Sequence, residues 1–483
     1  MVNSVFIDVF RALSTTLFSR YLRLNKAISN GVFDCGNLSP VHFQKKHSIH
    51  QKRFNFMGNR RLGALIVLAL LFITSKTQAQ TAVTWEQCVK EAENNNRDLK
   101  AAEQTVKAAD DTHIASFGQW FPQISIGSSL GRSGPDPSLD GALSDPNYTP
   151  SATLGINAQE TIFSGFKDFA SVDIANAQLD NAKAQLTQAK AQLSRDLKTD
   201  FYQLLYTQKQ IILLQTIHDR DKANQDLVQM NFSGGTDNKG SLMVAQAAVQ
   251  QDEYNINQSK RSLRVSQRQL DQVLGRSPMD DIVVSGDFGT LTLSDDPPNF
   301  LELIYETPAH LEAVAQYRIS DSQYVAARGA FFPTLTANAG LSGSGPSYDT
   351  MAAGWTATLS LNFPIFTGGH DFFTLNSAAE SKQGVKDILE STDLKTESQL
   401  ESSYAAYINA VQENKVQQFQ VKAAQTQEEI AKAEYLNGLL IFQNWNQIES
   451  NLTNQQNSEL SGLLNIKTAE ATWELTQGKG VIP

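Results

Sequence analysis

The sequence predicts a mainly α-helical fold with a smaller β part, built from a duplicated helix–strand–strand–long helix–helix unit. Three observations predict it. Residues 166–232 form 67 consecutive positions without glycine or proline. Four short segments alternate apolar residues with small or polar ones, and the order of elements in residues 80–278 recurs in residues 300–483. As one helix the long stretch would reach roughly 100 Å, which is too long for a single ordinary domain.

The N-terminal segment predicts export. Residues 1–79 contain 11 Lys and Arg against 2 Asp and Glu. A 12-residue apolar run, Leu62–Ile73, follows Arg60-Arg61 and precedes small residues up to Ala79, which is the pattern of a signal peptide over residues 57–79. Met57 is a natural start for this signal, so residues 1–56 are an upstream extension or a disordered N-terminus. No cysteine follows the cleavage point closely, so we expect no lipid anchor.

The remaining chain is acidic and lacks the motifs of catalysis. Residues 80–483 hold 29 Lys and Arg against 48 Asp and Glu, a net charge of −19, which argues against nucleic acid as a partner. Cys88, the one cysteine there, is expected to be buried. No phosphate-binding loop or nucleophile elbow occurs, so we expect neither an enzyme nor a cofactor. No metal site is expected either, because the histidines lack metal-ligand spacing: His113, His218, His310 and His370.

The first repeat is assigned to residues 80–278. Apolar positions recur at helical spacing before Gly118, then alternate with polar ones through two segments, and a seven-residue repeat runs through Val172, Leu179 and Leu186 in the long helix. The predicted elements are a helix at about 84–117, strands at about 121–133 and 152–163, and helices at about 166–232 and 241–274.

The second repeat, residues 300–483, follows the first at constant offsets. Phe331-Phe332-Pro333 repeats Trp120-Phe121-Pro122 after 211 residues, and Ile365-Phe366-Thr367-Gly368 repeats Ile162-Phe163-Ser164-Gly165 after 203, because the second strand loop is shorter. Residues 279–299 form a linker with one short strand pattern at Leu291 and Leu293. The predicted elements are a helix at about 300–328, strands at about 333–344 and 353–366, and helices at about 370–436 and 444–477.

The four strands predict an oligomer. Each alternates apolar with small or polar residues and is about long enough to cross a bilayer when tilted. Every strand must be paired in hydrocarbon, and four strands are too few to close a cylinder. Two chains would supply eight strands and three would supply twelve. Aromatic residues near the predicted strand ends suit a membrane-interface girdle, with core packing as the alternative: Trp120, Phe121, Phe331, Phe332 and Trp355.

These features resemble the TolC-type outer membrane efflux protein family. The resemblance covers roughly residues 82–478 and rests on the duplicated order, on Trp85-Glu86-Gln87-Cys88-Val89, on the Phe-Pro pairs that begin the strands, and on Pro364-Ile365-Phe366-Thr367-Gly368-Gly369. It implies a homotrimer with one 12-stranded β-barrel in the bacterial outer membrane, continued by a long α-helical barrel in the periplasm. It also implies two partners, a periplasmic adaptor (membrane fusion) protein and an inner-membrane RND or ABC transporter.

The resemblance places adaptor docking at the two helix turns, where an aromatic residue is followed by x-x-Gly. Here the matching residues are Phe232, Gly235 and Thr236, then Tyr435, Gly438 and Leu439. A left-handed glycine that ends each helix is an alternative reading, and it is compatible with docking.

Many relatives carry aspartates inside the tip, but this chain departs from that pattern. The matching positions are Ser241, Asn444 and Gln447, none of them acidic, and Asp237 is a substitute nearby. The function that the resemblance implies is passive export of substrate handed over by the pump. A protein-secretion channel and a periplasmic coiled-coil scaffold are the alternatives.

Overall fold

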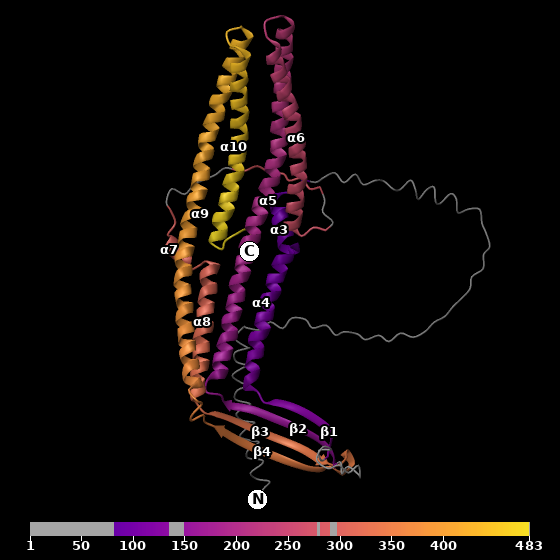
Figure 1. Ribbon diagram of the computed structural model, residues 1–483, viewed down its shortest axis with the longest axis vertical. Helices are drawn as coiled ribbons and strands as arrows, with labels where there is room; N and C mark the ends of the chain where they lie inside the picture. The colour runs from indigo at the N-terminus through magenta and orange to yellow at the C-terminus, as the bar shows by residue number, and fades with distance from the viewer. Residues whose placement is uncertain (1–81, 135–148, 278–280, 290–296, 483) are drawn as a thin grey trace, which may run out of the picture. The chain divides into compact units, whose positions relative to one another are not determined.

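The structure is a computed structural model that describes residues 82–134, 149–277, 281–289 and 297–482 (Figure 1). Residues 1–77 and 78–483 separate into two units, and all described residues belong to the second. The predicted signal peptide at 57–79, the extension 1–56 and the Leu291–Leu293 pattern lie outside the described residues.

Each repeat contains two strands between helices. The first comprises α3 (Trp85–Asn95), α4 (Arg97–Ser116), β1 (Gln123–Ser133), β2 (Thr149–Phe163), α5 (Lys167–Ser233) and α6 (Lys239–Leu274). The second comprises α7 (Phe300–Ile304), α8 (Pro308–Arg328), β3 (Thr334–Gly345), β4 (Ala352–Asn362), α9 (His370–Leu436) and α10 (Phe442–Thr476). Short 3₁₀ turns η2 (Phe117–Trp120) and η3 (Gly329–Phe331) precede β1 and β3, and η4 (Tyr348–Thr350) joins β3 to β4.

Most element bounds lie within three residues of the predicted ones, and β4 is an exception. It ends at Asn362, four residues before the predicted end. Pro364 stands two residues later, and proline has no N–H to donate to a strand ladder.

The predicted helix 84–117 is wrong as one piece because Asn96 interrupts it. The Asn96 side chain accepts a hydrogen bond from Leu99 N (2.9 Å), which caps α4, and donates one to Val273 O (2.9 Å) on α6. At Gly275, which follows α6 with φ 71°, a Cβ would lie 2.5 Å from Asn95 O. The break therefore fits α3 and α4 around the end of α6.

The predicted helix 300–328 is also two helices. Thr307 caps α8 by accepting a hydrogen bond from His310 N (3.4 Å), and Pro308 stands at its first position. A residue before a proline disfavours helical geometry, so Thr307 is extended and separates α7 from α8.

The strands form one antiparallel sheet in the order β1-β2-β3-β4. Ser133 pairs with Thr149 and Gln123 with Gln159, so β1 and β2 are fully in register. One irregularity occurs, between Thr161 and Phe163 on β2 where it pairs with β3. Within the described residues β1 and β4 are the two edges of this sheet.

The two long helices run alongside each other with α8 and α10, stacked end to end, between them (Figure 1). Helix α5 packs against α4 and α8 over the half nearer the sheet, and against α6 and α10 over the other half. Helix α9 packs against α8 and α10. No described helix is both long enough and apolar enough to cross a membrane.

The main hydrophobic core lies midway along the helices, where α3, α5, α6, residues 282–288 and Ile482 meet. Cys88 is fully buried there, which confirms the expectation from the sequence. Burial raises the pKa of its thiol to about 12; the charge of Arg276 lowers this pKa and the charge of Glu91 raises it further. Because the thiol stays protonated, this cysteine is expected to be unreactive.

Candidate functional site: sheet faces and hairpin tips

One face of the sheet is mostly apolar and exposed, and it carries Arg132 and Glu160 near the strand ends. Residues paired across antiparallel strands point to the same face, so the register defines each face. Ile126, Ile156, Leu341 and Trp355 are paired in succession across all four strands. Their exposed fractions are 73%, 45%, 58% and 62%. An exposed apolar band that crosses all four strands needs an apolar environment or a partner to cover it.

The opposite face carries small polar residues. Ser125, Asn157, Gly340 and Thr356 are paired across the four strands. The remaining regularly paired positions of this face are Ser, Thr, Gly, Gln, Asn or Ala, and the face bears no charged residue in the four strands that the structure describes. One apolar face and one hydrated face are the two sides that a wall between lipid and water requires.

Four of the five predicted interface aromatics gather where the sheet meets the helices, because Trp120 and Phe121 precede β1, and Phe331 and Phe332 precede β3. The Trp120 ring lies 5.4 Å from that of Phe169 and the Phe332 ring 5.5 Å from that of Phe166.

The fifth aromatic, Trp355, lies near the other end of β4. The five aromatic residues therefore lie in two groups, one at each end of the strands. Phe121, Phe331, Phe332 and Trp355 remain between 37% and 62% exposed, so core packing accounts for only part of their surface.

The α5–α6 and α9–α10 turns share one backbone conformation. Gly235 and Gly438 have φ of 79° and 73°. Thr236 N donates to Asn231 O and Leu439 N donates to Glu434 O, both at 2.9 Å, which is the six-residue hydrogen bond of a Schellman motif. The left-handed glycine expected from the sequence is therefore present in both repeats, and no atom would lie within 4 Å of an added Cβ.

Of the six predicted docking residues, the structure places Tyr435 inside rather than at the surface. Its side chain is 7% exposed and its ring stacks on Trp445 at 4.6 Å. The other five are exposed, with Leu439 at 78% and Phe232 at 37%. The sequence pattern treated Tyr435 and Phe232 as equivalent, but only Phe232 is accessible.

Tyr435 instead links the two tips. Its hydroxyl donates to Asp237 Oδ2 on the α5–α6 turn (2.8 Å) and accepts from Asn231 Nδ2 (3.1 Å). Burial raises the pKa of Tyr435 to about 12, opposed by Asn231 and reinforced by Asp237. Partial burial opposes ionisation of Asp237, but hydrogen bonds from Ser241, Tyr435 and Asn238 outweigh it and lower the pKa of this carboxyl.

The structure brings two of the four predicted constriction residues into contact, because the Ser241 side chain donates a hydrogen bond to Asp237. Ser241 is buried near the start of α6, where its N–H donates to Asn238 Oδ1 (3.0 Å). Asn444 and Gln447 are exposed on α10, and Asp237 is engaged by Tyr435. Within one subunit, Asp237 therefore acts as a link between hairpins.

A groove of about 1010 Å³ separates the two turns and is lined from both repeats, including Thr236, Asp237, Gly438 and Ile441. In the described residues no group of three or more His, Cys, Asp or Glu side chains is arranged to hold a metal ion.

Sequence reasoning missed Trp445, which is 1% exposed and packs between Tyr435 and Phe442. A signal was available, because Phe442 and Trp445 are three residues apart at the start of a helix and so share a face. It also missed the charged residues buried below the tips, which have no local sequence signature.

Comparison with known proteins identifies related chains. A family described as outer membrane efflux protein matches residues 88–276 and 302–477, one match in each repeat. The probable outer membrane lipoprotein SilC of Salmonella typhimurium is 25% identical over 305 residues, which cover 61% of this chain. The match spans 64% of the length of that relative.

Two solved structures share the fold. The outer membrane protein VceC of Vibrio cholerae aligns with a TM-score of 0.72 and 17% identity, over 82% of this chain and 96% of that one. The open state of the outer membrane channel MtrE of Neisseria gonorrhoeae aligns with a TM-score of 0.72 and 16% identity, over 82% and 89%.

Proposed function

This chain belongs to the outer membrane efflux protein family, and from that premise we propose that it is a trimeric outer membrane channel of a tripartite efflux system. Three copies contribute four strands each to one 12-stranded barrel, and their helices continue it as a tunnel through the periplasm. The channel is passive, and the energy for transport comes from an inner-membrane RND or ABC transporter, joined through a periplasmic adaptor.

The two-faced, open-edged sheet is the observation that carries this proposal. The apolar band through Ile126, Ile156, Leu341 and Trp355 suits lipid, and the polar face suits water. The edges β1 and β4 need partners in hydrocarbon, and further copies of the same sheet supply them.

We assign adaptor docking to the exposed turn residues Phe232, Gly235, Thr236, Gly438 and Leu439, and leave Tyr435 out because it is buried. Opening then requires the hairpins to separate or rotate, which breaks the Tyr435–Asp237 link. A periplasmic scaffold would need the long helices but would not need the two-faced sheet. No feature of the described residues specifically favours a protein-secretion channel.

The test uses the full chain, fractionated and then purified in detergent. We expect extraction from the outer membrane only with detergent, a crosslinked trimer, and ion conductance in planar lipid bilayers. A stable monomer, a water-soluble pool or the absence of conductance would contradict the proposal.

Docking is tested separately with Thr236→Cys and Leu439→Cys, which we expect to crosslink to the adaptor. Val265→Cys is the matched control, because Val265 is 57% exposed but lies on α6 far from the turn in sequence. Equal crosslinking from all three positions would refute docking at the tips.

A further inference from the structure

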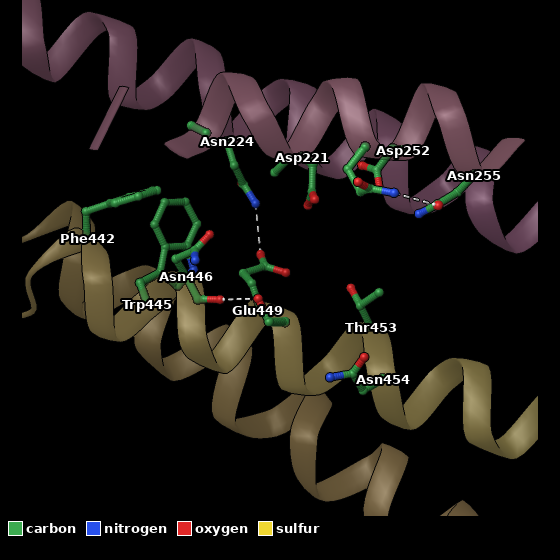
Figure 2. A pocket seen from close by; sticks show the side chains of 14 residues that line it. Asp221, Asn224, Asp252, Asn255, Phe442, Trp445, Asn446, Glu449, Thr453 and Asn454 are labelled. Carbon is green, nitrogen blue, oxygen red and sulfur yellow. Dashed lines mark hydrogen bonds between the residues drawn. The ribbon is translucent and has the colours of Figure 1, made fainter. Parts of the chain in front are cut away.

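Two pairs of acidic side chains are buried in the helices below the tips. Asp221 on α5 pairs with Asp252 on α6, and Glu428 on α9 pairs with Glu449 on α10. Each helix hairpin therefore contains one carboxyl pair. Figure 2 shows Asp221, Asp252 and Glu449 around a pocket of about 230 Å³ between α5, α6 and α10.

Three of the four carboxyls are more than nine-tenths buried: Asp252 and Glu449 are 7% exposed and Glu428 is 9% exposed. No described N–H or O–H group donates to Asp252 Oδ2 or Glu428 Oε1. A hydrogen bond within each pair forms when one carboxyl holds a proton and donates it to the other. Without that proton, two like charges face each other away from water.

Few positive charges compensate these carboxyls. Arg220 on α5 places Nε 2.9 Å from Glu449 Oε2 and donates from Nη2 to Thr453 Oγ1 (2.7 Å). Asn224 on α5 donates to Glu449 Oε1 (2.9 Å). The α5–α6 hairpin is therefore linked to the α9–α10 hairpin through the contacts of Arg220 and Asn224 with Glu449. The other titratable group acting on the cluster is His218, which favours ionisation of Asp221 and Asp252.

The charge balance depends on protons. With one proton in each pair, the four carboxyls carry two negative charges against the charge of Arg220. With none, they carry four. Burial raises the pKa of Glu449 to about 7, reinforced by Glu428 and opposed by Arg220. Burial and the neighbouring Asp221 raise the pKa of Asp252 to about 6.

We propose that these two carboxyl pairs form a proton-controlled clamp between the α5–α6 and α9–α10 hairpins, tight when each pair holds a proton and weakened when the pairs ionise. If the hairpins separate, the carboxyls that line the pocket between them, Asp221, Asp252 and Glu449, reach water and lose the part of the pKa shift that burial causes. A raised pKa in the joined state means that this state binds protons more tightly, so the stability of the joined state falls as pH rises through about 6 to 7.

The consequence for transport rests on the proposed function: the channel opens more readily at mildly alkaline than at mildly acidic pH. In planar bilayers containing the full chain, we expect the open fraction at pH 8 to exceed that at pH 5.5 by about tenfold. The double variant Glu428→Gln with Asp252→Asn removes one carboxyl of each pair but leaves Glu449 to titrate, so it should reduce this response. The matched control, Glu429→Gln with Glu253→Gln, neutralises exposed neighbours and should keep it.

A wild-type channel that conducts with no pH response would overturn the clamp, as would a double variant with an unchanged response. Absence of conductance at every pH would instead count against the proposed function. Size-exclusion chromatography of each variant establishes that the trimer is retained.

Hydrogen exchange supplies a readout that does not depend on conductance. After correction for intrinsic exchange, amides of α10 around Trp445 to Thr453 should lose more protection between pH 5.5 and pH 8 in the wild type than in the double variant. Equal protection at both pH values in the wild type would refute the inference.

Discussion

The two repeats fold alike but are covered unequally. Helices α5 and α9 are both 67 residues long and follow equivalent strands. Helix α5 is surrounded by α4, α6, α8 and α10, whereas α9 is in contact with α8 and α10 and with short α7. Large apolar side chains on α9 are consequently exposed, with Phe419 at 76% and Leu394 at 68%. The difference shows that the first repeat is the better covered of the two, and in the proposed trimer we expect the exposed surface of α9 to contact another subunit.

The largest effect is expected from substitutions in the sheet. There we predict that equivalent substitutions in the two repeats destabilise the membrane-inserted state equally. Leu130 on β1 and Leu341 on β3 are equivalent at the 211-residue offset, and both belong to the apolar face. Leu130→Arg and Leu341→Arg should each destabilise the membrane-inserted state by about 2–4 kcal/mol per subunit, because lipid does not solvate the guanidinium. Outer-membrane fractionation and heat resistance of the trimer measure this.

Ser129→Arg and Ser342→Arg are the controls, since both residues lie on the polar face. They should leave insertion intact and alter conductance. Equal loss of insertion from arginine on both faces would show that the sheet has no lipid-facing side.

The second prediction separates the repeats. Phe419→Glu on α9 should abolish the trimer. Burial of the exposed phenylalanine between subunits would stabilise the trimer by about 1.5–3 kcal/mol, whereas burial of a charged glutamate there would destabilise it. Thr216 is the equivalent position on α5, and Thr216→Glu should leave the trimer intact. Light scattering of the detergent-solubilised protein distinguishes trimer from monomer. If Phe419→Glu remains trimeric, α9 does not form the subunit contact.

The third prediction concerns one hydroxyl group. Tyr435→Phe removes the hydrogen bond to Asp237 while keeping the ring against Trp445. Hydrogen bonds to charged groups contribute about 1.5–3 kcal/mol, so we expect a higher open fraction in planar bilayers. Phe232→Tyr, at the equivalent and exposed position, should have little effect. An unchanged open fraction in Tyr435→Phe would mean that the tips are held elsewhere.

This link should also differ from the buried clamp in its pH response. The lowered pKa of Asp237 means that its contribution is present above about pH 4 and is lost as pH falls further. The raised pKa of Tyr435 means that its contribution is lost only as pH rises from about 10 toward 12. Between pH 5.5 and 8 the Tyr435–Asp237 link is therefore constant, and the Tyr435→Phe variant should retain the wild-type pH response.

The smallest effect is expected at the turn glycines. Gly235→Ala and Gly438→Ala should each cost about 1 kcal/mol, because alanine is strained at positive φ while nothing obstructs its side chain. The two turns share a conformation, so the two shifts in thermal unfolding should be equal. A clearly larger loss at one turn would show that the repeats differ there too.

The sequence was most informative where local pattern decides structure. Seven-residue spacing and the absence of glycine and proline located α5. The repeated Phe-Pro and Gly positions located α9, which contains Gly384, and alternation of apolar and polar residues located the four strands. It failed where a distant contact decides. The break at Asn96 is fixed partly by Val273 O on α6, 177 residues away, although Thr307-Pro308 did carry a local signal for the other break.

The candidate site was predicted only in part for the same reason. The tip glycines have a local motif, so their positions and conformation could be predicted. That Tyr435 turns inward depends on Trp445 and on Asp237, 198 residues earlier, and no periodicity reports such a pairing. The buried carboxyl pairs occur among many surface acids of an acidic chain, and only packing distinguishes them.

The polar face of the sheet bears on selectivity. Its side chains are short and uncharged, so a bore lined by three such faces would offer neither fixed ions nor bulky groups to discriminate between passing solutes. Sieving at the cell surface would then be coarse, and the choice of what leaves the cell would be made before the cargo arrives there.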